Sequence, residues 1–322
     1  MMINQKGRFR KIVKWFLWII LAQTILINIS AALYAYKLTH LLTPTANTWN
    51  KKVSKNIFAK TWRLFVGPDW YRYLVTTTPP FAYSTVSMKT KSGIPIEAWY
   101  AAADTVAKGT VILFHGLMGN KGMIMDEAIA FHKLGYNIFL VDVRNHGNSG
   151  GRVTTVGYKE TEEVKLAYDH VVASGEKKIV LWGGSLGAVE IVKAVSDYQL
   201  QPSALIAEIP FLSLESHLKG RARILGFPEQ PFGFLTAFWI GVEQGFNGLG
   251  FMTTKYAANI DCPVLLQFGE KDELVLEEET NKIYAAIASS NKRLVKYDDA
   301  GHGSLLAKDP KKWMNEVGRF LQ

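Results

Sequence analysis

Two Gly-x-Ser-x-Gly motifs stand out in the sequence, and this pattern can present a nucleophilic serine on a sharp turn. The first motif, GNSGG, contains Ser149, and the second, GGSLG, contains Ser185. A nucleophile elbow needs a strand that leads directly into the first glycine and a helix that opens directly after the serine. We expect at most one of the two serines to be a nucleophile, so the flanking residues must decide.

The flanking residues favour Ser185. The extended run KKIVLW leads into Gly183, and residues 186–198 then carry apolar side chains at helical spacing. The turn places the serine at a helix N-terminus, where the helix dipole stabilises developing negative charge. Ser149 is followed by GGRVTTVGY, a glycine-rich and β-branched loop. We therefore predict that Ser185 is the nucleophile and that Ser149 is a turn hydroxyl.

A reactive serine needs a base and an acid that orients the base. His302 lies between two glycines in the loop after the last expected strand, and we predict that it is the base. The acid is expected between serine and histidine in this chain order, which favours Asp272 in the segment GEKDELV. Three carboxylates remain alternatives for the acid: Glu208, Glu270 and Glu273. Structural or surface roles are expected for four other histidines, His115, His132, His146 and His170.

The segment FHGLMGN after the run at residues 110–115 supplies the expected oxyanion hole. Backbone N–H groups of Leu117 and Leu186 are the predicted donors to the oxyanion. This chemistry implies no metal and no organic cofactor. Cys262 is the only cysteine, so the chain has neither an intrachain disulfide nor a Cys-based metal site.

Alternating extended and helical segments must position these residues. Strands alternating with helices predict a mostly parallel sheet with helices on both faces, an α/β fold. Extended runs are expected at residues 81–90, 94–102, 110–115, 136–143, 178–183, 204–209, 263–268 and 293–298. Helices are expected at about 124–134, 158–174, 186–198, 277–289 and 310–321.

The gap at residues 210–260 is too long for one crossover connection, so it holds an insertion. It carries eight large aromatic side chains between Phe211 and Phe251. We expect a short helical lid above the serine, with Phe238 and Trp239 lining an acyl pocket. The alternative is a lid whose apolar face only packs on the sheet.

The N-terminal segment has the pattern of a membrane anchor. Residues 15–36 carry no charge, and as a helix they would span roughly 33 Å, enough to cross a bilayer core. The basic tail at residues 1–14 precedes them, which predicts a signal anchor with an extracytoplasmic catalytic domain. The competing interpretation is a signal peptide cleaved near SAA at residues 30–32, which would give a secreted or periplasmic protein.

Charge is divided unevenly along the chain. Residues 1–80 carry a net charge of +11 and residues 81–322 a net charge of −2, so the catalytic region is not basic. This division favours a lipid bilayer over nucleic acid as partner. Residues 49–65 predict an amphipathic helix, which lies either on anionic lipid or on the main domain. The predicted domains are the tail, the anchor, a basic amphipathic linker at 37–80 and the hydrolase domain at 81–322.

Taken together, the motifs resemble the α/β-hydrolase superfamily, in particular its serine aminopeptidase-like, monoglyceride lipase-like and acyl-esterase-like members. The matching segments, in family order, are HGLMGN, DVRNHGNSGG, GGSLG, GEKDELV and AGHGSL. The resemblance implies Ser185, Asp272 and His302 as the triad and a non-catalytic Ser149. The usual Arg-Gly-x-Gly is replaced by Arg-Asn-His-Gly at residues 144–147, which affects loop shape more than chemistry. Membrane-anchored members have a similar layout.

These observations predict a membrane-anchored serine hydrolase that acts through an acyl-enzyme on Ser185. A carboxylesterase or lipase-like activity on a small-molecule acyl substrate is the first choice. A peptidase, amidase or thioesterase with the same triad is the alternative within the enzyme class. A non-catalytic membrane-tethered scaffold is the alternative outside it. Protein partners and the natural leaving group are not indicated by the sequence.

Overall fold

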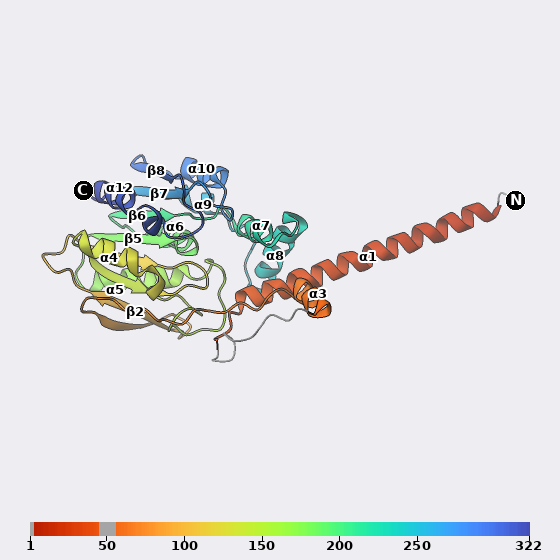
Figure 1. The fold of residues 1–322 in the computed structure, drawn as a ribbon, viewed down its shortest axis with the longest axis horizontal. Helices are drawn as coiled ribbons and strands as arrows, with labels where there is room; N and C mark the ends of the chain where they lie inside the picture. The colour runs from red at the N-terminus through yellow and green to blue at the C-terminus, as the bar shows by residue number, and fades with distance from the viewer. Residues whose placement is uncertain (1–2, 45–55) are drawn as a thin grey trace.

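The computed structural model describes residues 3–44 and 56–322 of the chain. A sheet of eight strands lies at the centre of the folded body, in the order β1-β2-β4-β3-β5-β6-β7-β8 (Figure 1). β2 pairs antiparallel with β1 and β4, and all pairings from β4 to β8 are parallel. The strands are Ser84–Lys89 (β1), Pro95–Ala101 (β2), Thr110–Phe114 (β3), Asn137–Val141 (β4), Ile179–Gly184 (β5), Ala204–Glu208 (β6), Val264–Gly269 (β7) and Lys292–Tyr297 (β8).

Helices cover both faces of this sheet, which explains why β3, β6 and β7 are buried along their whole length. α5 (Thr161–Ala173), α6 (Leu186–Tyr198) and α10 (Glu277–Ala286) share one hydrophobic core with the sheet. α4 (Met125–Lys133) and α12 (Pro310–Phe320) share the other. Each expected strand and helix overlaps an observed one, and the predicted α/β fold class is confirmed. Two short helices, η1 (Lys121–Ile124) and α11 (Leu305–Lys308), complete the body.

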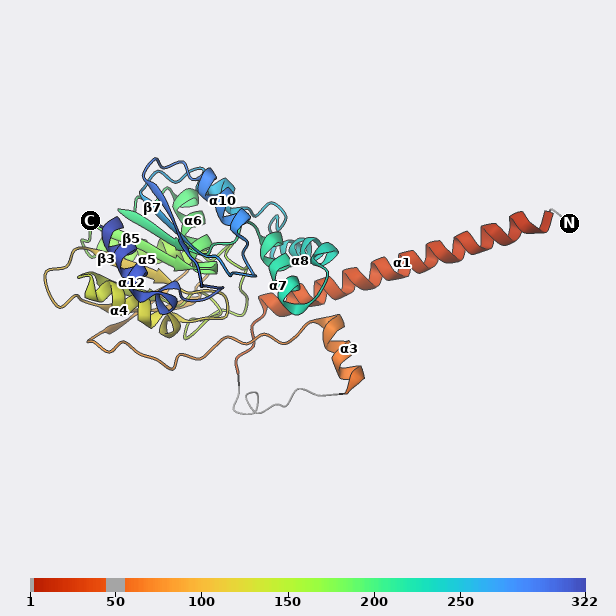
Figure 2. The ribbon, with the colours of Figure 1, turned by 45° about the horizontal axis from the view of Figure 1, so that its top comes forward.

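The insertion at residues 210–260 is helical. It contains α7 (Leu214–Leu225), α8 (Glu229–Gln244) and the short α9 (Thr253–Ala257). A capping box between Ser213 and Ser216 starts α7. α7 and α8 pack on each other, and α8 also packs on α1, so the insertion lies between the body and the N-terminal helix (Figures 1 and 2).

The N-terminal helix α1 (Ile3–Thr39) is longer at both ends than the predicted segment 15–36. Its stretch 7–39 is, within the described ranges, the one helix long and apolar enough to cross a membrane. Its side chains are exposed from residue 7 to residue 27, and this part projects away from the body (Figure 1). The last turns enter the protein, where Tyr34 is 2% and Leu38 0% exposed.

α3 (Ile57–Val66) lies beside the base of α1 (Figure 2). It covers the second part of the predicted helix 49–65, whereas residues 49–55 lie outside the described residues. Asn56 caps it by accepting a hydrogen bond from the Phe58 amide. Phe58 and Trp62 remain 81% and 62% exposed, whereas Val66 at the end of the helix is 5% exposed, so the helix buries only its last turn.

Candidate active site

Ser185 occupies the sharp turn between β5 and α6. Its backbone has φ 53° and ψ −111°, a left-handed conformation that residues with a side chain rarely adopt. The Ser185 amide donates a 2.8 Å hydrogen bond to the Glu208 carbonyl at the end of β6. The turn is therefore held in a strained conformation that lifts the hydroxyl out of the sheet edge.

The two flanking glycines are required because backbone atoms approach them too closely for a side chain. A Cβ atom on Gly183 would lie 2.4 Å from the carbonyl carbon of Gly187, and one on Gly187 would lie 2.3 Å from the Phe114 carbonyl oxygen. Neither glycine has a positive φ. The motif thus lets α6 start directly against β3 and β5, while the serine itself carries the strain.

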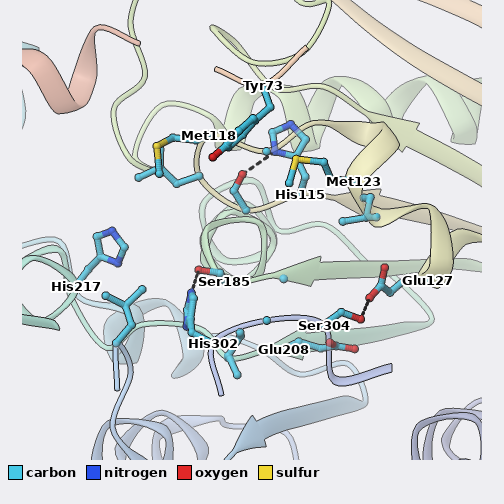
Figure 3. Close-up of a pocket in the computed structure, with 18 of the residues that line it drawn as sticks. Tyr73, His115, Met118, Met123, Glu127, Ser185, Glu208, His217, His302 and Ser304 are labelled. Atoms are coloured by element: carbon cyan, nitrogen blue, oxygen red, sulfur yellow. Dashed lines mark hydrogen bonds between the residues drawn. The ribbon is translucent and has the colours of Figure 1, made fainter. Parts of the chain in front are cut away.

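His302 and Asp272 complete a hydrogen-bond chain with Ser185. The Ser185 hydroxyl lies 2.9 Å from His302 Nε2 (Figure 3). His302 Nδ1 donates to Asp272 Oδ2 at 2.7 Å. The other oxygen of Asp272 accepts from the amides of Leu274 and Val275 at 2.7 and 2.9 Å, which fixes the carboxylate. This geometry allows His302 to take the serine proton while Asp272 orients the ring.

The alternative acids do not reach His302. Glu208 is buried, and its Oε1 accepts from Trp182 Nε1 at 2.9 Å and from Trp313 Nε1 at 2.6 Å. Burial raises the pKa of the Glu208 carboxyl to about 8, with Glu127 adding to the shift. Glu270 and Glu273 are exposed. Of the four carboxylates considered from the sequence, only Asp272 hydrogen-bonds His302.

The predicted oxyanion loop lies against the elbow. A Cβ atom on Gly116 would lie 3.6 Å from the Ser185 Cβ, and the next residue, Leu117, lines the same cavity as Ser185. Among the hydrogen bonds of described residues, none uses the amide of Leu117 or Leu186. Both amides thus have no acceptor among these hydrogen bonds, as the predicted role requires.

His146 shapes this loop, a role the sequence did not indicate. Its Nδ1 donates to the Arg144 carbonyl at 2.9 Å, and its Nε2 accepts from the Met118 amide at 2.9 Å. Burial, aided by His115, lowers the pKa of His146 to about 4 and keeps Nε2 available as an acceptor. Asn145, which replaces the usual glycine, has φ 60°, a conformation that asparagine tolerates better than most residues.

Ser149 lies in a turn away from the triad. It is 2% exposed, donates to the Asp142 carbonyl at 2.6 Å and accepts from the Glu97 amide at 2.9 Å. The first hydrogen bond lies within the loop after β4, and the second ties this loop to β2. This serine has the geometry of a structural hydroxyl.

A cavity of about 350 Å³ opens beside Ser185. Ser185 and His302 lie between His217 on one side and Glu127, Ser304 and Glu208 on the other (Figure 3). Ser304 donates a 2.5 Å hydrogen bond to Glu127, and burial raises the pKa of the Glu127 carboxyl. The apolar part of the lining includes Leu117, Met123, Ile124, Trp182, Ile209 and Leu274.

The predicted acyl-pocket residues Phe238 and Trp239 do not line this cavity. Phe238 is 42% exposed, and Trp239 Nε1 donates to Asn28 of α1 at 3.3 Å. The prediction of their place was wrong because α8 packs on α7 and α1 in a way that leaves Phe238 exposed and places Trp239 beside α1. The lid residues in the cavity are His217 and Arg221 of α7, which the sequence analysis had not singled out.

This chain has the α/β-hydrolase fold, and it is similar to members of the α/β-hydrolase superfamily. The family model described as serine aminopeptidase, S33, matches residues 105–232. The solved structure of the Pyrococcus furiosus esterase Pf2001 is 27% identical, with a TM-score of 0.63, and the match covers 76% of this chain and 97% of that one.

Two curated relatives extend the comparison. Lysophosphatidylserine lipase ABHD12 of Macaca fascicularis is 26% identical over 60% of this chain and 48% of the relative. An uncharacterized membrane protein of Saccharomyces cerevisiae is 25% identical over 70% of this chain and 76% of its own. The chain spans about half the length of the lipase relatives it matches.

Proposed function

We propose that this chain is a membrane-anchored carboxylic ester hydrolase that works through an acyl-enzyme on Ser185. The observation that carries the proposal is the hydrogen-bond chain from Ser185 through His302 to Asp272 at a cavity with apolar walls. The retained elbow strain and the two unused amides beside it support the same conclusion, since a non-catalytic scaffold has no need of either.

In the proposed reaction His302 accepts the proton of Ser185 as the hydroxyl oxygen attacks the ester carbonyl. The amides of Leu117 and Leu186 stabilise the tetrahedral oxyanion. His302 then gives its proton to the leaving alcohol, and the acyl-enzyme forms. Water, deprotonated by the same histidine, releases the acid and restores the serine. Asp272 orients the ring and stabilises its charged form in both halves.

Ester hydrolysis is favoured by the similarity to an esterase and to lysophosphatidylserine lipases. Amide hydrolysis is the second candidate, because the matching family model is described as a serine aminopeptidase. Glu127 and Glu208 line the cavity and are the carboxyls available to a substrate ammonium group. Comparing turnover of p-nitrophenyl, thioester and aminoacyl anilide substrates separates esterase, thioesterase and aminopeptidase activities.

Membrane anchoring is supported by the exposed part of α1. Within the exposed residues 7–27, residues 15–27 carry no charge and would span roughly 20 Å as a helix, while the basic residues between 8 and 14 would meet lipid headgroups. Phe58 of α3 and Phe238 of α8 are exposed near the base of this helix, where they would meet the lipid surface. Residues 30–32, the alternative cleavage site, lie in helical turns that already pack on the protein, which favours an uncleaved anchor.

A fluorophosphonate probe tests the catalytic proposal. We expect labelling of the wild-type chain and of Ser149→Ala, and no labelling of Ser185→Ala. Equal labelling of Ser185→Ala, or no labelling of the wild-type chain, would contradict the proposed nucleophile and would favour the non-catalytic scaffold in the second case.

Truncation tests the anchor. Removing residues 1–27 deletes exposed side chains and leaves the buried turns of α1 in place. We expect this variant to leave the membrane fraction and still to react with the probe. A reporter fused after Gln322 is expected to lie on the extracytoplasmic side, and a cytoplasmic signal would reverse the proposed topology.

A further inference from the structure

Arg221 brings a positive charge into the catalytic cavity without a counterion. It projects from α7 and lines the cavity together with Ser185 and His217. The described residues place no carboxylate within 4.0 Å of its guanidinium, whereas Arg144, Arg223 and Arg293 each form an ion pair with a glutamate. Burial lowers the pKa of the Arg221 guanidinium, as expected for a cation without a compensating anion.

His217, one turn earlier on α7, adds an unused hydrogen-bond donor. Arg221 Nε donates to His217 Nε2 at 2.8 Å. Because a guanidinium cannot accept, Nε2 must carry the lone pair and the proton must be on Nδ1. His217 is 1% exposed, and its Nδ1 has no partner among the described residues. A buried donor without an acceptor is costly, typically about 1–3 kcal/mol.

The surroundings hold the guanidinium in place without neutralising it. Its central carbon lies 5.0 Å from the centre of the Trp70 ring, and Trp70 packs edge-on against Tyr34 of α1. Such cation–π stacking fixes orientation and leaves the terminal N–H groups for a ligand. The carboxyls that line the cavity, Glu127 and Glu208, lie on the far side of Ser185 from His217 (Figure 3).

We propose that Arg221 and His217 form a binding subsite for an anionic group, phosphate or carboxylate, on the alcohol part of the ester. The guanidinium supplies charge and His217 Nδ1–H supplies one directed hydrogen bond, which is the donor set that a phosphate or carboxylate oxygen needs. The acyl chain then occupies the opposite, apolar part of the cavity, near Met123, Ile124 and Trp182. This inference rests on the proposed ester hydrolysis and adds the charge of the substrate to it.

A matched ester series tests the subsite. The substrates are oleoyl esters of glycerol, glyceric acid and glycerol 3-phosphate, which share the acyl chain and differ in the charge of the alcohol. We expect the wild-type chain to prefer at least one charged ester over the neutral one by about 10- to 100-fold in kcat/KM, the strength of charge-assisted hydrogen bonds. The two charged esters distinguish a carboxylate from a phosphate ligand.

In Arg221→Met we expect the ratio of kcat/KM for the charged and the neutral ester to fall to about 1, whatever the absolute rates. In Arg221→Lys we expect an intermediate ratio. Arg223→Met is the matched control, because Arg223 lies on the same helix but pairs with Glu229 outside the cavity. It should keep the wild-type preference. A wild-type preference near 1, or one that survives in Arg221→Met, overturns the subsite.

Binding to the Ser185→Ala chain tests the subsite without any turnover. Calorimetry with decyl phosphate, decanoate and decanol is expected to give tighter binding of at least one anion, by about tenfold or more, and loss of that difference when Arg221→Met is added. Equal binding of the three amphiphiles overturns the subsite. Failure of wild-type labelling by the fluorophosphonate probe instead overturns the catalytic proposal, so the two failures are distinguishable.

Discussion

Ser149 and Ser185 have the same five-residue pattern around them and opposite backbone strain. At the elbow, Ser185 has the positive φ, and its flanking glycines, Gly183 and Gly187, avoid collision with backbone atoms. In the other motif the glycines have the positive φ, 46° at Gly147 and 91° at Gly151. Ser149 itself is unstrained and doubly hydrogen-bonded.

The difference shows what a Gly-x-Ser-x-Gly motif can mean. Glycine can be needed for conformational freedom or for lack of volume, and the sequence pattern is the same in both cases. Where the glycines are needed for their lack of volume, as around Ser185, the serine is strained and partly exposed at a helix start. The helix opening after Ser185, and its absence after Ser149, was the sequence feature that separated them.

The largest expected effect lies in the two serine-to-alanine variants. Ser185→Ala should lower kcat for an ester substrate by about 10⁴- to 10⁶-fold, because the nucleophile is lost. Ser149→Ala should keep turnover per folded molecule within about threefold of wild type, since its hydroxyl is distant from the substrate. Steady-state assays on purified, folded protein measure both, and a large loss in Ser149→Ala would break the comparison.

The acid behind the base is the next test. Asp272→Asn should fold normally and lose about 10²- to 10⁴-fold in kcat. The amide oxygen can still accept from the Leu274 and Val275 amides, but the NH₂ group would face His302 Nδ1 and favour the wrong tautomer. Near-normal turnover would move the acid role to Glu208, Glu270 or Glu273. Glu270→Gln, an exposed neighbour, is the control and should be close to wild type.

The glycine after the elbow tests the steric interpretation. Gly187→Ala should lower the free energy of unfolding by about 3 kcal/mol or more, because its Cβ would overlap the Phe114 carbonyl oxygen. Gly175→Ala is a useful contrast, since nothing lies within 4 Å of a Cβ there and only its φ of 93° is unfavourable. Urea unfolding of both variants should give the larger loss for Gly187→Ala; the reverse order would show that conformation outweighs close approach.

A smaller effect is expected from the hydrogen bonds of Ser149. Ser149→Ala leaves the Asp142 carbonyl and the Glu97 amide without their partner and should cost about 1–3 kcal/mol in the free energy of unfolding. Ser185→Ala should lower the free energy of unfolding by less, because the Ser185 side chain makes one hydrogen bond, to His302. Chemical denaturation compares the two, and equal losses would remove the structural half of the contrast.

The pH dependence of stability beside the elbow is the subtlest test. Burial raises the pKa of Glu208 to about 8 from an ordinary value of 4.5. Between these values the folded chain keeps a proton that the unfolded chain has released, so this contribution to stability falls as pH rises. Glu208→Gln should therefore gain stability relative to wild type from pH 5 to pH 8, by up to about 1.4 kcal/mol per pH unit. If the difference in urea midpoint between Glu208→Gln and wild type stayed constant from pH 5 to pH 8, Glu208 would be ionised in the folded chain.

Most of the fold and the three triad positions followed from local patterns. Buried strands, helical spacing and the loops after β5, β7 and β8 lie in short, continuous segments, so the sequence alone indicated Ser185, Asp272 and His302. In the structure these three residues form one hydrogen-bond chain. Their catalytic roles stay predictions until the variants are measured.

The lid could not be predicted in the same way. Which side of α7 and α8 meets the serine depends on how α7 packs on α8 and how α8 packs on α1, the latter a contact between segments about 200 residues apart. Phe238 and Trp239 were assigned to the substrate because they are aromatic, and Arg221 was passed over because a single arginine has no local signature. The orienting role of His146 likewise depends on a contact with Met118 from another loop.

The base of α1 has a consequence for how the protein meets its substrate. Tyr34 and Leu38 share one hydrophobic cluster with Leu218 of α7 and with Leu186, which directly follows Ser185. The helix is therefore joined rigidly to the body. Rotation of the helix about its base would disrupt the hydrophobic packing behind the elbow. Anchored in a bilayer, such a body would keep one tilt and one height above the headgroups. Substrate would then be met by lateral diffusion, and only esters presented at that height would reach the serine.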